Sequence, residues 1–203
     1  MNINIASYCR LTNHKLEVND IDIQIQKTEA SSLNDIYRHL NLSYPKFFKM
    51  DNLSKAGFLA SELLLKNIII DKETPKKDMA IVLMNRSASL DNDRTYQTTI
   101  QYENNFFPSP SVFVYTLSNI VNGEIAIRNK IMGESSFYIS ENFSPEKIYS
   151  AVMNTFSDPN INQVICGWVD YEFNECDVLL LLIRKENQEK IPFNVNNIYH
   201  LYT

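Results

Sequence analysis

The stretch FFPSPSVFVYTLSNIVNGEIAIRNKIMGESSFYISEN, residues 106–142, decides how this chain folds. Its second half, from Asn119 to Gly133, has the apolar spacing of an amphipathic helix. The apolar positions on or near one face are Ile120, Val121, Ile125 and Ile127. Glu124 and Arg128 are four residues apart, and we expect them to pair on another face. Gly133 suits a left-handed helix end, and SSFYIS, residues 135–140, is rich in strand formers. The stretch therefore predicts a loop, a helix, a glycine and a strand, in that order.

This pattern resembles the part of the β-ketoacyl synthases, in the thiolase superfamily, that precedes the nucleophilic cysteine. The positions that match the family's spacing are Asn119, Val121, Gly123, Ile127 and Gly133. In the family, a strand follows the last glycine, and the cysteine then stands at the N-terminus of a buried helix. The corresponding position here is Asn142, and the sequence has no cysteine at or near it. The resemblance covers residues 3–184 and implies the N-terminal half of the family's fold.

The remaining pattern predicts an α/β domain, a layered mixed β-sheet with helices on both faces. The predicted strands are residues 2–8, 79–84, 135–140, 163–168 and 177–183, with a half-buried strand or a hairpin over residues 17–26. The predicted helices are residues 33–40, 52–66, 119–133 and 144–156. Residues 79–84, MAIVLM, are apolar throughout, as in a strand covered on both faces. Residues 85–105 are polar, and we expect an irregular segment with a short helix near Tyr96. We expect one domain over residues 1–203, with its core in residues 1–185 and a tail, residues 186–203, that has no counterpart in the family.

Composition excludes several classes of function. The chain has 203 residues, is 44% hydrophobic and carries a formal net charge of -5. It has no basic block, so we expect no nucleic-acid partner. Its longest apolar run, residues 178–183, is too short to cross a bilayer, and its N-terminus lacks the pattern of a signal peptide. The three cysteines lack metal-type spacing and fit free thiols in a reducing cytosol. We therefore expect a cytoplasmic protein without a metal or a cofactor.

The chemistry that the resemblance implies is incomplete in this chain. A ketosynthase uses a cysteine thiolate at a helix N-terminus, where backbone amides lower the pKa of the thiol and hold the oxyanion. Asn142 offers an amide, which is not a nucleophile. The assisting histidines belong to the family's C-terminal half, and this chain is expected to end about where that half would begin. We therefore expect no catalysis by this chain alone. An active 3-oxoacyl-carrier-protein synthase or acyltransferase that uses Cys166 or a non-cysteine mechanism stays an alternative, although a cysteine in a buried strand is usually a small hydrophobe.

The resemblance also implies a partner. In ketosynthases, the strand before the nucleophile pairs with its twin across the dimer axis, and an uncovered edge strand needs such a partner. That edge is here Ser135, Ser136, Phe137, Tyr138, Ile139 and Ser140. Some type II polyketide systems pair a catalytic ketosynthase with an inactive homologue, the chain-length factor, which lines the far end of the acyl tunnel. The candidate wall residues are Phe107, Pro108, Ser109, Pro110, Ser111 and Val112. A plainer interpretation of this segment is a rigid proline-rich loop with core aromatics.

The first functional hypothesis is therefore a non-catalytic subunit of fatty-acid or polyketide chain elongation. It is similar to the small ketosynthase-like proteins of aryl polyene and flexirubin-type pigment clusters. It would pair with a complete ketosynthase. The sequence leaves open whether it also contacts acyl carrier protein. A homodimeric binding module that uses the same edge is a further alternative. One face of the helix at residues 144–156 and just beyond is polar: Glu146, Lys147, Ser150, Asn154, Ser157 and Asp158. We expect this face to be exposed, as if resurfaced where the family's second half would cover it.

Overall fold

The computed structural model describes residues 2–24, 33–66, 68, 74–186 and 190–203. Its strands form one eight-stranded sheet in the order β3-β2-β1-β7-β6-β4-β5, with β8 paired to β1. The strands are β1 Asn2–Thr12, β2 Leu16–Val18, β3 Ile21–Asp22, β4 Met79–Asn85, β5 Ser135–Ile139, β6 Gln163–Glu172, β7 Glu175–Glu186 and β8 Ile191–Pro192. The sheet is mixed, because β4 is parallel to β5 and β6 while β7 is antiparallel to β1 and β6.

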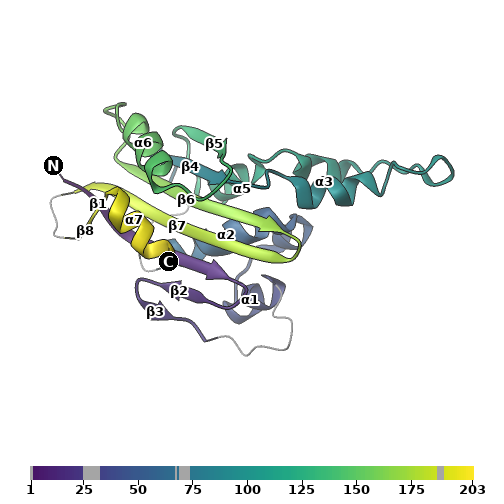
Figure 1. Cartoon of the computed structure of the whole chain (residues 1–203), viewed down its shortest axis with the longest axis horizontal. Helices are drawn as coiled ribbons and strands as arrows, with labels where there is room; N and C mark the ends of the chain where they lie inside the picture. Colours follow the sequence, from purple (N-terminus) through teal and green to yellow (C-terminus); the bar gives the residue numbers. More distant parts are fainter. Residues whose placement is uncertain (1, 25–32, 67, 69–73, 187–189) are drawn as a thin grey trace.

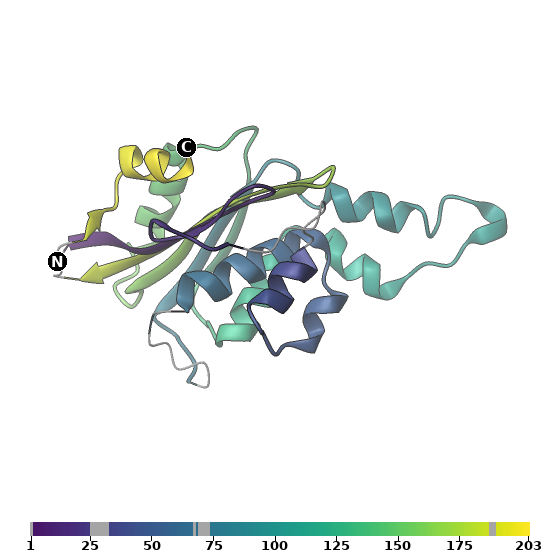
Figure 2. The ribbon, with the colours of Figure 1, turned by 90° about the horizontal axis from the view of Figure 1, so that it is seen from below.

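Helices cover both faces of this sheet, as the sequence predicts. The helices are α1 Leu33–His39, η1 Pro45–Lys49, α2 Asn52–Leu65, α3 Leu90–Gln97, η2 Glu103–Asn105, α4 Pro110–Phe113, η3 Val114–Thr116, α5 Ile120–Asn129, α6 Pro145–Thr155 and α7 Val195–Tyr202. Figure 2 shows α1, α2 and α5 on one face and α6 and α7 on the other. Among the described residues, no helix is long and apolar enough to cross a membrane.

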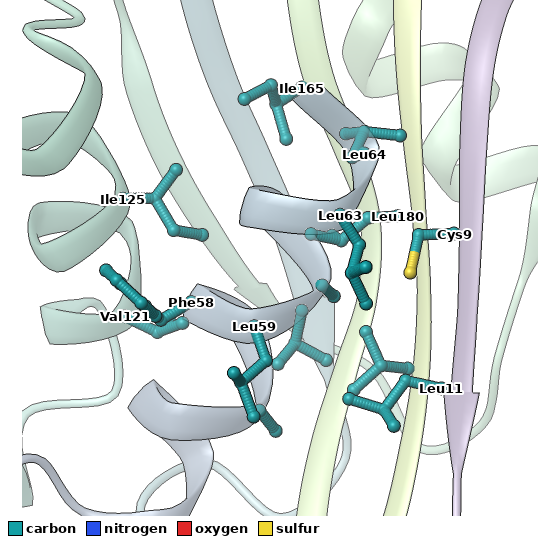
Figure 3. Close-up of a cluster of buried hydrophobic side chains, with 14 of the residues drawn as sticks. Cys9, Leu11, Phe58, Leu59, Leu63, Leu64, Val121, Ile125, Ile165 and Leu180 are labelled. Atoms are coloured by element: carbon teal, nitrogen blue, oxygen red, sulfur yellow. The ribbon is translucent and has the colours of Figure 1, made fainter. Parts of the chain in front are cut away.

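The two faces of the sheet bury two separate apolar cores. Along β4, Met79, Ile81 and Leu83 pack under α2 and α5, whereas the alternate residues pack under α6 and α7. This follows from the two-residue period of a strand, and it explains why MAIVLM is apolar throughout. Figure 3 shows the α2 side, where Leu63 of α2 lies beside Leu180 of β7 and Phe58 of α2 lies beside Val121 of α5. Each such fully buried side chain contributes about 1.5–3 kcal/mol relative to exposure.

Helix α5 differs from its prediction in three respects. It ends at Asn129, and Lys130 takes the left-handed conformation, with φ 52, that we assigned to Gly133. Gly133 is instead needed for close approach, because a Cβ there would lie 2.3 Å from the Met79 carbonyl oxygen. Ile127, expected on the buried face, is 63% exposed.

The expected pair between Glu124 and Arg128 is also wrong. Glu124 is buried and instead meets Lys46 at 2.8 Å and the Tyr115 hydroxyl at 3.0 Å. Arg128 donates two hydrogen bonds of 3.0 Å to Glu62 of α2. Other elements therefore supply the partners of both side chains, which helical spacing alone could not reveal.

The C-terminal end of the chain also departs from expectation. Residues 190–203 are no separate tail, because Phe193 and Ile198 are buried in the core on the α6 side. Of the strand or hairpin expected at residues 17–26, the structure has the hairpin, with β2 and β3 joined by a turn in which two residues adopt positive φ. Its last two residues, 25 and 26, lie outside the described residues.

Residues 89–117, here called the arm, project from the sheet beyond the end of β4 (Figures 1 and 2). They contain α3, η2, α4 and η3, and α3 confirms the short helix expected near Tyr96. The large apolar side chains exposed on the arm are Leu90, Tyr102, Phe106, Phe107, Phe113, Val114 and Leu117. Phe107 is 74% exposed, so the plainer interpretation of this segment as a loop of core aromatics is wrong.

Candidate functional site

The candidate site begins where β5 turns into α6. Asn142 lies in this connection and is exposed. It stands two residues before Ser144, the N-cap of α6, whose Oγ accepts from the Lys147 amide at 3.2 Å. Pro145 follows in the first turn and has no amide hydrogen. Position 142 thus lies at the strand-to-helix junction, before the N-cap of α6, as the sequence predicts.

The groups around this junction do not form a nucleophile. Ser140 is buried and its Oγ donates to the Asn142 carbonyl at 2.9 Å, while Lys147 donates to Ser140 Oγ at 3.0 Å. Activating a serine through lysine needs a desolvated, neutral amine, but Lys147 is exposed to solvent. The Ser140 proton already has an acceptor, so these contacts fasten the connection between β5 and α6.

The three cysteines lie inside the fold. Cys9 and Cys166 are fully buried, and burial raises the pKa of both thiols. Burial also raises the pKa of Cys176 to about 12. Because the thiolate is the reactive form, none of these residues is placed to carry an acyl group. Within the described ranges, no three His, Cys, Asp or Glu side chains are arranged to hold a metal ion.

The predicted dimer edge lies at the end of the sheet. Among the described strands, β5 pairs with β4 alone, so its other side is uncovered. Tyr138 is 43% exposed and Ile139 is 55% exposed, whereas Phe137 is half-buried against α5 and β4 and Ser140 is buried. Unpaired backbone groups beside exposed apolar side chains make β5 a site for pairing with another strand.

The arm starts beside this edge. Asn85, the last residue of β4, is in register with Ile139, and its carbonyl accepts from the Ser140 amide at 2.8 Å. The point where the chain leaves β4 for the arm therefore lies beside the end of β5, and the arm extends away from it (Figure 1).

The six candidate wall residues separate into two groups. Ser111 and Val112 line a hollow of about 240 Å³ at the base of the arm, together with Asp51 and Asp91. Phe107, Pro108 and Pro110 are exposed, and Ser109 is half-buried. The hollow holds two carboxyl groups, and burial together with the nearby charge of Asp91 raises the pKa of Asp51 to about 6.

The polar face of α6 is exposed, as predicted. Its exposed side chains are Glu146, Lys147, Ser150 and Asn154, followed beyond the helix by Ser157 and Asp158. Ile148 and Val152 on the opposite face are buried. Helix α7 packs beside α6, and Tyr202 stacks on Phe143 with ring centroids 3.7 Å apart. The hypothesis of a resurfaced face requires Glu146, Lys147 and Asn154 to be exposed, and burial of these residues would have excluded it.

Comparison with solved structures shows the fold predicted from the sequence, that of ketosynthases and chain-length factors. "The ishigamide ketosynthase/chain length factor" matches with a TM-score of 0.67 at 11% identity, over 95% of this chain and 64% of that chain. A chain of the Xenorhabdus doucetiae ketosynthase ApeO in complex with its chain length factor ApeC matches with a TM-score of 0.65 at 13% identity, over 100% of this chain and 90% of that chain. A β-ketoacyl synthase from Burkholderia phymatum matches with a TM-score of 0.60 at 8% identity.

This chain spans less than two thirds of the ishigamide and Burkholderia chains, at 64% and 59% of their lengths. It spans most of the Xenorhabdus chain, which is therefore only slightly longer. No family model matches the sequence, and no curated protein matches it. At such low identities the likeness defines the fold, and the function has to be argued from the site.

Proposed function

We propose that this chain is a non-catalytic, chain-length-factor-like subunit that pairs with a catalytic ketosynthase in fatty-acid or polyketide chain elongation of the aryl polyene type. The observation that carries the proposal is the uncovered β5 edge beside a junction where the nucleophile position holds an exposed asparagine. Strand pairing is thus available where ketosynthases dimerise, without the sulfur that their chemistry needs.

The site supports assembly better than catalysis. Asn142 precedes the N-cap of α6 by two residues, and Pro145 removes one of the amides that could hold an oxyanion. In the alternative of an active enzyme that uses a cysteine, the candidate is Cys166, whose thiol is 0% exposed and has a raised pKa. Its strand position and burial favour a packing role.

The partner we propose is a complete ketosynthase. Two of the solved structures with this fold are described as a ketosynthase together with a chain length factor. The β5 edge would supply backbone pairing, and the exposed side chains of the arm would add apolar area, which interface cores need. Phe107–Val112 would then form part of the acyl-pocket wall, completed by the partner, because in this chain alone these residues are mostly exposed. Free thiols fit our placement of the pair in the cytoplasm.

Co-expression with candidate ketosynthases, followed by gel filtration and native mass spectrometry, tests this proposal. We expect a one-to-one complex that Tyr138→Lys weakens, because a charge on β5 would be desolvated at the interface. Tyr199→Lys is the matched control, since Tyr199 on α7 is 58% exposed and α7 packs on β1 and α6. A stable monomer with every ketosynthase, or equal effects of the two variants, would count against the proposal.

A second measurement separates the alternatives. After incubation with acyl carrier protein or acyl-CoA, intact-mass spectrometry should find no acyl adduct on this chain. An adduct on Cys166 or any other residue would favour the active enzyme. A homodimer that persists in the presence of ketosynthase would favour the binding module.

A further inference from the structure

The arm leaves β4 through a turn whose polar groups are buried and paired. The side-chain amide of Asn85 donates through Nδ2 to the Ala88 carbonyl at 2.9 Å and accepts at Oδ1 from the Ala88 backbone amide at 3.0 Å. Ala88 has φ 52, a conformation that residues with a Cβ rarely adopt. Asn85 is fully buried and Ser87 nearly so. The direction in which the chain leaves the sheet is therefore fixed by specific contacts.

One buried carboxylate ties this turn to the hairpin between β6 and β7. Asp170 of β6 accepts from the Ser87 hydroxyl at 2.6 Å and from the Ser87 amide at 3.0 Å. It also accepts from the Arg86 amide at 3.3 Å, and the Arg86 guanidinium lies 3.5 Å from its second oxygen. Asp170 is 6% exposed, so these charge-assisted bonds form where water competes little.

The tip of the same hairpin contacts α3, the first helix of the arm. Glu172 pairs with Arg94 of α3 at 2.7 Å, and the Arg94 guanidinium lies 4.4 Å from the centre of the Phe173 ring. Phe173 and Asn174 have φ of 52 and 63, which in a two-residue hairpin favours asparagine followed by glycine. An exposed aromatic residue is a poor choice for such a turn, and the contact with Arg94 gives a reason for it. Figure 2 shows the hairpin tip beside the start of α3.

Within the arm, the segment that begins α3 is hydrogen-bonded to the returning segment that contains α4 and η3. The Ser89 hydroxyl donates to the Thr116 carbonyl at 2.8 Å, and the Asn92 side chain donates to the Val112 carbonyl at 2.8 Å. Both donors are buried. The hairpin thus reaches the candidate wall segment through α3.

We propose that the β6–β7 hairpin is a clamp that sets the direction of the arm, with Asp170, Glu172 and Phe173 as positioning residues. The inference rests on the proposed function, because it gives the clamp a purpose: presenting residues 107–112 to the partner at a fixed angle. A polar network at a junction that an apolar contact could fill favours one geometry over others, at some cost in stability.

The first test needs no partner, so it does not depend on the proposed function. Hydrogen exchange of the amides in α3 and η3 is measured in the isolated chain and in two variants. Phe173→Gly removes the ring but suits the turn, so we expect the midpoint of urea unfolding to stay unchanged or rise while arm amides exchange faster. Asp170→Asn should raise exchange in the arm about tenfold or more, since it weakens several bonds to a charged group. Glu175→Gln is the control, because Glu175 lies on the same hairpin but accepts from Asn13, away from the arm. Unchanged arm exchange in both Phe173→Gly and Asp170→Asn would overturn the clamp.

The second test measures association with a ketosynthase that binds the unmodified chain. Phe173→Gly and Asp170→Asn should raise the dissociation constant, and Glu175→Gln should not. A looser arm with an unchanged dissociation constant would overturn the positioning role. Failure of the unmodified chain to bind any ketosynthase would instead refute the proposed function, while the exchange experiment would still decide whether the clamp exists.

Discussion

Replacing Asp51 by asparagine is expected to stabilise this protein at neutral pH and to leave its stability at low pH nearly unchanged. Asp51 caps α2 by accepting from the Ser54 amide at 3.0 Å. Burial, and to a smaller extent the charge of Asp91, raises the pKa of Asp51 from 3.8 to about 6, although its bonds to α2 act in the opposite direction. The folded state therefore binds a proton on Asp51 more tightly than the unfolded chain does.

The sign and size of the effect follow from this pKa. Because the folded pKa is raised, the stability linked to Asp51 is fully present below pH 3.8 and is lost as the pH rises through about 6. At about 1.4 kcal/mol per pH unit, the loss by neutral pH is up to about 3 kcal/mol. Asparagine caps a helix about as well as aspartate and does not ionise, so Asp51→Asn should avoid this loss.

Urea unfolding followed by circular dichroism, at several values between about pH 4 and pH 7.5, measures the difference. The free energy of unfolding of Asp51→Asn should exceed that of the unmodified protein by an amount that grows with pH. Asp51→Ala is the control for the cap, and at low pH it should cost about 1 kcal/mol relative to asparagine. A difference independent of pH, or a less stable asparagine variant at neutral pH, would refute the reasoning.

Three further predictions concern packing, a buried ion pair and the thiols. Gly133→Ala should lower the free energy of unfolding by about 1–3 kcal/mol, because the added Cβ would lie 2.3 Å from a backbone oxygen. In α5, the Cβ added by Gly123→Ala would have no atom within 4 Å, so this substitution should raise the free energy of unfolding by about 0.5–1 kcal/mol. Arg128→Met leaves the buried carboxylate of Glu62 without its bidentate partner and should cost about 3–5 kcal/mol in the same assay. The three buried cysteines should react with an aromatic disulfide reagent at the rate of unfolding, and faster labelling of the native protein would contradict their burial.

The apolar pattern predicted most of the sheet, because each strand is indicated by consecutive residues of the sequence. In β4, apolar residues without a break indicate cover on both faces, and β5 reads as a short strand after a glycine. The sequence also placed the start of α6, since Ser144 before Pro145 is a strong N-terminal signal and Ser144 does cap the helix. These elements frame the strand-to-helix junction, so the position of Asn142 between them followed from the sequence.

Features that depend on partners distant in sequence were missed. Glu124 and Arg128 have a favourable helical spacing, but Glu124 pairs with Lys46 and Arg128 pairs with the buried Glu62. Lys130 has no sequence signal for a left-handed conformation, whereas Gly133 has one but serves close packing. The clamp could not be predicted because it joins residues 86–94 to residues 170–173, about 80 positions apart in a sequence whose local pattern is polar in both places.

The central claim is that β5 pairs with a strand of a ketosynthase, and hydrogen exchange of its backbone measures this most directly. Amides of residues 135–139 that point away from β4 should exchange freely in the isolated chain and become protected when the ketosynthase is added, together with amides of the arm. A complex that forms while exchange in β5 stays unchanged would contradict the account.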